Sequence, residues 1–188
     1  MGILSFEPFP KIARLCREVV VTEKIDGTNA QVIVSDDGLS IGAASRSRLI
    51  TPDADNFGFA RWVHDHREEL LALGPGRHFG EWYGAGIQRG YGLREKRFAL
   101  FNVDRWGGDR PACCGVVPVL YRGAFDTRAI ENAFEMLRVS GSAIAPGFDR
   151  PEGIIVYHTA GRVGFKRTFE KDDEGKSASA LKARQAAS

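Results

Sequence analysis

The chain has few cysteines, no long apolar run and almost no net charge. Only three of its 188 residues are cysteine (Cys16, Cys113 and Cys114), too few for a disulfide framework or for the two cysteine pairs of a zinc site. No stretch approaches the roughly 18 apolar residues of a membrane-spanning helix, and the N-terminus lacks the pattern of a signal peptide. We therefore expect a cytoplasmic protein that makes no contact with a membrane.

The formal net charge of +2 gives little support for nucleic-acid binding from composition alone, because nucleic-acid-binding domains usually carry a basic face. Any basic surface must then be local, and short arginine and lysine clusters occur at 46–48, 89–97 and 162–167. The glycine-rich stretch 84–92 lacks the Gly-Lys-Ser/Thr ending of a P-loop, which excludes that class of phosphate site. Hydrophobic residues, at 43%, suffice for a core.

Short apolar and alternating runs predict an α+β fold dominated by antiparallel sheets, because strands cluster in hairpins rather than alternating with helices. Thr127 is expected to cap the last helix, and Pro118 to place its strand at a sheet edge. We expect one domain over residues 1–170, then a polar tail at 171–188 and no separate C-terminal domain. The expected strands are 19–21, 31–35, 39–43, 78–83, 98–103, 116–121, 152–158 and 162–169, and the expected helices are 12–16, 57–73 and 127–139.

Four charged residues lie inside apolar strand patterns: Lys24, Glu81, Glu152 and Lys166. Burying such a group is costly unless it pairs with another charge or contacts a ligand. Each one alone is best explained as a buried salt bridge or a solvent-facing residue, but the four together indicate a shared polar cleft. Lys24 ends an apolar run beside a glycine, where partial loss of hydration favours the neutral, nucleophilic amine.

The segment Lys24-Ile25-Asp26-Gly27 matches the K-x-D-G motif of the covalent nucleotidyltransferases, and the sequence resembles the nick-sealing and RNA-editing branch of the ATP-dependent RNA ligases. This resemblance implies an antiparallel-sheet, ATP-grasp-like ligase adenylation domain with two or three flanking helices. Segments similar to the other family motifs follow in the family order, at Ser45-Arg46, 80–88 (with Gly-Ile-Gln), 98–103, 152–155 and 163–166.

The resemblance implies a catalytic role for three residues. Lys24 would attack the α-phosphate of ATP and form lysyl-AMP, Lys166 would neutralise that phosphate, and Glu152 would bind Mg²⁺ or Mn²⁺. AMP would then pass to the 5′-phosphate of an RNA, either a nicked duplex or tRNA, and a 3′-hydroxyl would seal the strand. An end-healing kinase or phosphatase, or an RNA-binding protein, could act as a partner.

The resemblance also implies that six residues bind the nucleotide. They are Glu23 (adenine, through its backbone), Asp26 and Asn29 (near the sugar and Lys24), Arg46 (ribose or a phosphate), Glu81 (ribose) and Phe101 (stacked on adenine).

One position departs from the family pattern. The last motif usually carries two lysines two residues apart, but Thr168 occupies the second position and Arg167 is expected on the opposite strand face. Arg162 or Lys171 could substitute for the missing cation. Two alternatives therefore stay open: a GTP-dependent capping-type guanylyltransferase, and a non-catalytic nucleic-acid-binding module with a degenerate pocket.

Overall fold

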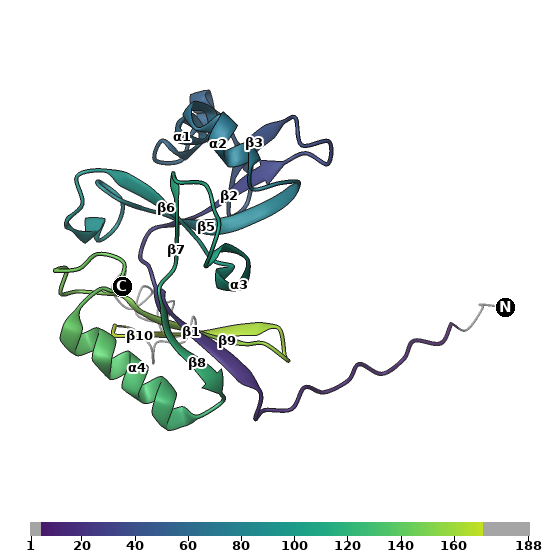
Figure 1. Ribbon diagram of the computed structural model, residues 1–188, viewed down its shortest axis with the longest axis vertical. Helices are drawn as coiled ribbons and strands as arrows, with labels where there is room; N and C mark the ends of the chain where they lie inside the picture. The colour runs from purple at the N-terminus through teal and green to yellow at the C-terminus, as the bar shows by residue number, and fades with distance from the viewer. Residues whose placement is uncertain (1–4, 171–188) are drawn as a thin grey trace, which may run out of the picture.

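The computed structural model describes residues 5–170, which form two β-sheets stacked one above the other (Figure 1). All strand pairs are antiparallel except β6–β7, so the model confirms the expected α+β fold with antiparallel sheets. The four-stranded sheet has the order β10-β9-β1-β8 and consists of β1 (Glu18–Lys24), β8 (Val119–Ala124), β9 (Gly153–His158) and β10 (Val163–Thr168). The six-stranded sheet has the order β4-β3-β2-β5-β6-β7 and consists of β2 (Thr28–Val34), β3 (Ile41–Ser45), β4 (Leu49–Ile50), β5 (Gly76–Gly84), β6 (Lys96–Leu100) and β7 (Cys114–Val116).

The chain crosses between the sheets at two short connections. β1 ends at Lys24 in the four-stranded sheet and β2 begins at Thr28 in the six-stranded sheet, so the K-x-D-G segment is itself a crossover. The return runs through Pro118, between β7 and β8. The single strand expected at 116–121 is therefore wrong, because proline cannot continue a ladder and here separates two edge strands of different sheets.

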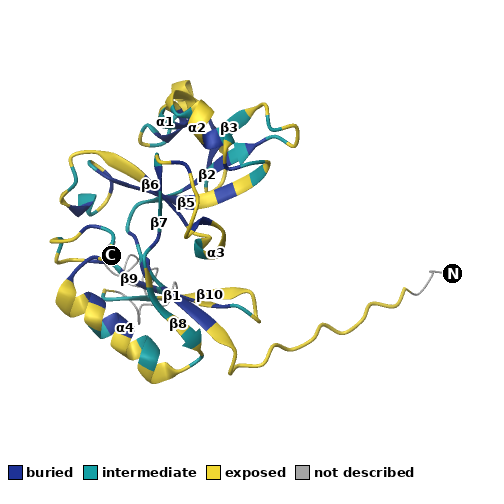
Figure 2. Ribbon diagram, in the orientation of Figure 1, coloured by how far each residue is buried: buried dark blue, intermediate teal, exposed yellow. Residues whose placement is uncertain are grey.

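Each sheet buries one face under helices, as the dark-blue segments in Figure 2 show. Helices α1 (Phe59–Asp65) and α2 (Arg67–Leu71) pack on the six-stranded sheet, where Phe59 meets Trp82 and Phe98 at ring distances of 5.4 and 5.1 Å. Helix α4 (Thr127–Ser140) packs on the four-stranded sheet through Phe134 and Leu137. The opposite faces of the two sheets are left to line the space between them.

Two expectations about helices and one about a strand are wrong in detail. The single helix at 57–73 is broken at His66, whose backbone leaves helical torsion angles. Asp126, not Thr127, is the N-cap of α4, and its carboxylate accepts a hydrogen bond from the Arg128 N–H. The strand expected to reach residue 103 ends at Leu100, because the Asn102 side chain caps a short helix, α3 (Val103–Trp106).

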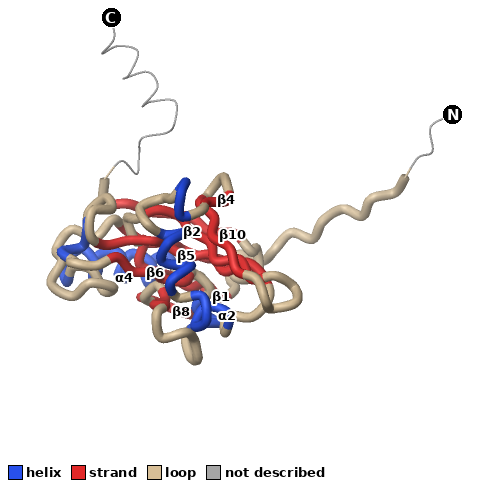
Figure 3. The backbone as a smooth tube through the Cα atoms, turned by 90° about the horizontal axis from the view of Figure 1, so that it is seen from above, coloured by secondary structure: helices blue, strands red, loops and turns tan. Residues whose placement is uncertain are grey.

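The helix expected at 12–16 does not form. Residues 5–14 are exposed and without regular structure, and in Figures 1 and 3 this arm runs away from the body of the molecule. A helix of one turn gains too little to form without a surface to bury its apolar side. Two 3₁₀ turns (Pro52–Ala54 and Gly90–Gly92) complete the regular structure of residues 5–170.

The tail at 171–188 lies outside the described residues. No helix between residues 5 and 170 is long and apolar enough to cross a membrane. Cys114 is buried in the core of the six-stranded sheet, and the described residues contain no cluster of three His, Cys, Asp or Glu side chains suited to a metal.

Candidate active site

A cavity of about 940 Å³ lies between the uncovered faces of the two sheets. Seven of the nine residues singled out from the sequence line it: Glu23, Lys24, Asn29, Arg46, Glu81, Phe101 and Lys166. They come from six different segments of the chain, and the crossover at 24–28 joins the two walls. The tertiary structure thus brings together most of the predicted set.

Lys24 and Glu152 form an ion pair at the cavity wall. The Lys24 Nζ lies 2.5 Å from a carboxylate oxygen of Glu152, and both side chains remain about one-fifth exposed. The pair forms because Lys24 is the last residue of β1 and lies opposite Gly153 of β9, one position after Glu152. Gly153 adopts a φ of +153°, and a Cβ there would come within 2.1 Å of the Arg167 carbonyl oxygen, so a side chain would break this end of the sheet.

Lys166 lies on β10, on the same wall, opposite Ile155 of β9. It lines the cavity and is exposed. Arg167 faces away from the cavity: its guanidinium bonds Glu131 of α4 and lies 4.0 Å from the centre of the Phe134 ring. Of the two candidate replacements for the missing lysine, Arg162 is in the hairpin turn before β10 and Lys171 is outside the described residues.

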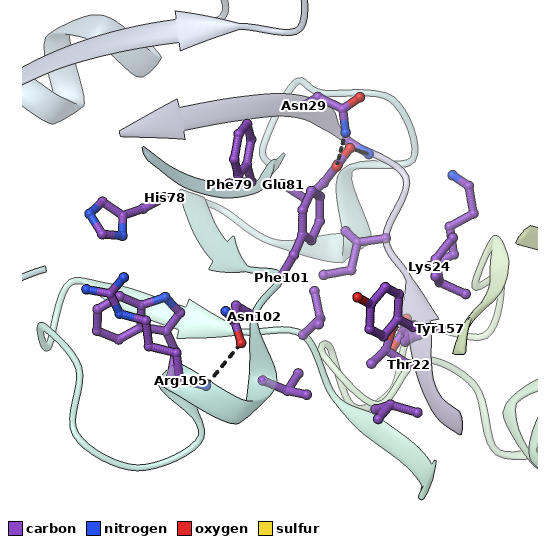
Figure 4. A pocket seen from close by; sticks show the side chains of 18 of the residues that line it. Thr22, Lys24, Asn29, His78, Phe79, Glu81, Phe101, Asn102, Arg105 and Tyr157 are labelled. Carbon is purple, nitrogen blue, oxygen red and sulfur yellow. Dashed lines mark hydrogen bonds between the residues drawn. The ribbon is translucent and has the colours of Figure 1, made fainter. Parts of the chain in front are cut away.

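Glu81 lies on the opposite wall and is held by two hydrogen bonds. Its carboxylate accepts from the Asn29 side-chain amide at 3.1 Å, drawn in Figure 4, and from the Gly27 N–H at 3.2 Å. The second bond requires a close approach, since a Cβ on Gly27 would lie 2.4 Å from the Trp82 carbonyl oxygen. Burial raises the pKa of Glu81 to about 7, although the nearby charge of Lys24 and both hydrogen bonds act in the opposite direction.

Phe101 follows β6 and presents its ring to the cavity with 40% of its surface exposed. Its N–H donates to the Phe79 carbonyl, which extends the pairing of β5 and β6 by one residue. In Figure 4 its ring lies between Glu81 and Tyr157, whose side chain enters from the four-stranded sheet. An exposed aromatic face at this depth can stack on a planar base.

The Glu23 side chain points away from the cavity, into the loop before Gly147. Only 1% exposed, it accepts hydrogen bonds from the Ser142 hydroxyl and from the Ala143 and Ile144 N–H groups. Burial raises its pKa, and these three bonds partly oppose that shift. Any contact between Glu23 and a nucleotide must therefore come from its backbone.

Two predicted residues do not line the cavity: Glu152, which is bonded to Lys24, and Asp26. The Asp26 carboxylate pairs with the Arg89 Nε at 2.9 Å. Arg89 and Tyr91, both in contact with Asp26, were not predicted, because nothing in a glycine-rich loop indicates which distant turn it will meet.

Ile155 and Tyr157 line the cavity and were also missed, although the alternation along β9 places both on the face opposite the core residues Ile154 and Val156.

Solved structures with a similar fold include those of a Naegleria gruberi RNA ligase. A Naegleria gruberi RNA ligase mutant with AMP and Mn matches with a TM-score of 0.60 and 22% identity, over 82% of this chain and 50% of that one. A second mutant, with ATP and Mn, gives 0.62 and 20% over 83% and 51%, and a third, without nucleotide, gives 0.59 and 20% over 92% and 52%. The chain thus spans about half the length of these proteins, and no curated protein sequence matches it significantly.

These likenesses establish the fold as the nucleotidyltransferase type found in RNA ligases. A family model described as RNA ligase matches residues 17–173, so the chain belongs to the RNA ligase family.

Proposed function

We propose that the chain is an ATP-dependent RNA ligase in which Lys24 carries AMP as a covalent intermediate. The observation that carries this proposal is the position of the Lys24 amine. It ends at the wall of a cavity large enough for a nucleotide, 2.5 Å from Glu152, with Glu81 and Phe101 on the facing wall. The Naegleria enzymes with ATP or AMP and Mn supply the nucleotide and metal of the proposal.

In the first step the neutral Lys24 amine attacks the α-phosphorus of ATP. A nitrogen–phosphorus bond forms, the bond from the α-phosphorus to the bridging oxygen breaks, pyrophosphate leaves, and the nitrogen gives up one proton to water. The amine must first lose its ammonium proton, and the Glu152 carboxylate is an acceptor within hydrogen-bond reach. Lys166, on the same wall, places a positive charge where negative charge develops on the α-phosphate.

The facing wall would hold the nucleoside. Phe101 would stack on the adenine, and Glu81, aligned by Asn29 and Gly27, would accept a hydrogen bond from a ribose hydroxyl. Arg46, exposed at the cavity edge just after β3, would contact the ribose or a phosphate. Because Glu81 is already held by two donors, it would be in place before ATP arrives.

The residues present fit a divalent metal that is shared with the substrate. Mg²⁺ sites often use one or two carboxylates, with phosphate oxygens and water completing the coordination. Glu152 offers one carboxylate at the phosphate end of the cavity, and no group of three ligating side chains occurs among residues 5–170. A bound Mg²⁺ or Mn²⁺ would supply positive charge against the phosphates.

In the sealing steps AMP passes to RNA. An oxygen of a 5′-phosphate attacks the phosphorus of lysyl-AMP, the nitrogen–phosphorus bond breaks, and the leaving nitrogen takes a proton from water to restore the Lys24 amine. A 3′-hydroxyl then attacks the 5′-phosphorus, its proton is lost to water, and AMP leaves as the strand is sealed. Membership of the RNA ligase family supports RNA as the acceptor, in the form of a nicked duplex or tRNA.

Labelling of the protein tests the proposal. The chain is incubated with α-³²P-ATP or α-³²P-GTP and Mg²⁺ or Mn²⁺, denatured, and examined for label that stays on the protein. We expect label from ATP, no label with Lys24→Arg, which keeps the charge but is not a nucleophile, and normal label with Lys11→Ala as a control on the exposed arm. Label from GTP alone would instead identify a capping-type guanylyltransferase. No label from either nucleotide would contradict both enzyme functions and favour a non-catalytic nucleic-acid-binding module.

A further inference from the structure

The glycine-rich loop between β5 and β6 holds the segment that follows Lys24 through two contacts with Asp26. The Tyr91 hydroxyl accepts a hydrogen bond from the Asp26 N–H at 2.7 Å, and the Arg89 Nε donates to the Asp26 carboxylate at 2.9 Å. Tyr91 is buried and packs against the rings of Tyr83 and Phe148, with centroid distances of 5.7 and 4.8 Å. The loop is therefore a fixed support and not an open phosphate cradle.

Arg89 contacts two further segments with the rest of its guanidinium. Its Nη1 donates to the Arg150 carbonyl oxygen at 3.2 Å, two residues before Glu152, and its Nη2 lies 3.4 Å from the Glu170 carboxylate, four residues after Lys166. A guanidinium has five N–H donors in a rigid plane, which lets one side chain bind three acceptors in different directions. A lysine ammonium cannot reach all three from one position.

These contacts begin where the β-ladder stops. Lys24, Gly153 and Thr168 form the last paired positions of β1, β9 and β10. Strand pairing therefore reaches Lys24 and Lys166, and the Glu152 carbonyl oxygen still accepts a hydrogen bond from the Phe169 N–H. Arg89 joins the positions just outside this pairing, at Asp26, Arg150 and Glu170. The side chain of Arg89 is 22% exposed, so its ion pair with Asp26 is partly shielded from water.

We propose that Arg89 is a positioning residue for nucleotidyl transfer, which holds the segments of Lys24, Glu152 and Lys166 in one arrangement. The inference rests on the proposed function and concerns how the same site is built. In-line attack by an amine needs the reacting atoms within about 3–3.5 Å, and an error of 1 Å can cost about a hundredfold in rate. In this arrangement Asp26 acts through Arg89 rather than by touching the nucleotide.

Single-turnover kinetics test the proposal, because a rate constant does not depend on the fraction of active protein. Formation of lysyl-AMP is followed at saturating labelled ATP in the full chain. We expect Arg89→Met to lower the rate constant at least tenfold with little change in the KM for ATP, and Arg89→Lys to recover part of the loss. Arg94→Met is the matched control: Arg94 is exposed, lies three residues after Tyr91, and its side chain has no hydrogen-bond or ion-pair partner within residues 5–170.

A double-mutant cycle separates support through Arg89 from direct nucleotide contact by Asp26. If Asp26 acts through Arg89, Asp26→Asn and Arg89→Met together slow the step no more than the larger single change. Additive losses, a raised KM for ATP in Asp26→Asn, or an unchanged rate constant in Arg89→Met would overturn the proposal.

The same double-mutant cycle can be measured by thermal unfolding, which does not depend on activity. The Tm shifts of Asp26→Asn and Arg89→Met should be non-additive. If the wild-type chain takes no label, the proposed function fails, but the unfolding cycle still shows whether Arg89 and Asp26 are coupled. Additive Tm shifts would show that Arg89 and Asp26 are not coupled, and would contradict the proposal.

Discussion

Across the cavity, the two sheets hold their polar side chains in different ways. The four-stranded sheet presents Lys24 and Lys166, with Glu152 just before β9, and these groups stay partly or largely exposed. The six-stranded sheet presents Glu81, which is 8% exposed and bound by Asn29. One wall therefore offers partly hydrated charges, two of which form an ion pair, while the other offers a desolvated carboxylate fixed by two hydrogen bonds.

The difference indicates a division of labour within one cavity. Charges that neutralise a phosphate must be free to move from one partner to another as the phosphate changes, and partial hydration permits that. Groups that recognise a base and a sugar gain from being fixed beforehand, because less conformational freedom is lost on binding. Substitutions of the phosphate-neutralising charges should therefore lower the rate of lysyl-AMP formation, and substitutions of the base-binding groups should raise the KM for ATP.

The largest effect is expected at Lys166. Lys166→Met should lower the single-turnover rate of lysyl-AMP formation by about 10²–10³-fold, the usual loss when one preorganised transition-state contact is removed. Arg167→Met removes the same charge one residue later, on the face that bonds Glu131, and should leave that rate within about twofold. Equal losses in both variants would contradict the orientation of β10.

The next largest effect is a pH dependence of stability at Glu81. Its pKa is raised from 4.5 to about 7 in the folded chain, so the folded state binds the proton more tightly. Glu81 therefore stabilises the fold most below pH 4.5, and this contribution is lost as the pH rises to about 7, by at most about 3 kcal/mol.

Glu81→Gln should remove this slope. Glu23 also has a raised pKa and acts in the same direction, so the difference between wild type and variant isolates Glu81. Urea unfolding at pH 4.5, 6 and 7.5 measures the free energy of unfolding of both proteins. The same pH dependence in both would contradict the raised pKa of Glu81.

A smaller effect is expected at Phe101. Phe101→Leu keeps an apolar side chain but removes the ring, and should raise the KM for ATP by about tenfold, from a stacking free energy of about 1–3 kcal/mol. The rate at saturating ATP should change little, since the ring contacts the base and not the phosphate. A fall in that rate at unchanged KM would show that Phe101 affects the chemical step and not the binding of ATP.

The smallest effect tests the scaffold of the four-stranded sheet. Asp126→Ala removes the N-cap of α4 and should lower the free energy of unfolding by about 1 kcal/mol. Because α4 packs on the face away from the cavity, lysyl-AMP formation should be unaffected at 25 °C. Asp126→Asn, which keeps a capping oxygen, should retain most of the stability.

Much of the fold follows from local patterns. The apolar run Val19–Val21 predicted β1, and the strands expected at 31–35 and 39–43 lie within a few residues of β2 and β3. The errors occur where a distant surface decides the outcome. The arm at 12–16 has helical spacing but nothing to pack against, and the run at 116–121 is divided because its halves join different sheets.

The candidate site divides in the same manner. Charged residues in apolar strands, together with the K-x-D-G segment, were sufficient to name Lys24, Glu81, Glu152 and Lys166. The contact between Asp26 and Arg89 was not predictable, because it spans 63 residues and neither local segment contains a signal for the other. A role for Asp26 beside the sugar is an expectation that the observed geometry does not support.

The sequence by itself determined seven of the residues that line the cavity, because motif chemistry and strand alternation are local properties. Only the tertiary structure decided how they are arranged. It places the Lys24 segment at a crossover between two sheets and turns Glu23 and Asp26 away from the cavity. It also gives Arg89 contacts with three segments, since these relations depend on strand pairing between residues far apart in the chain.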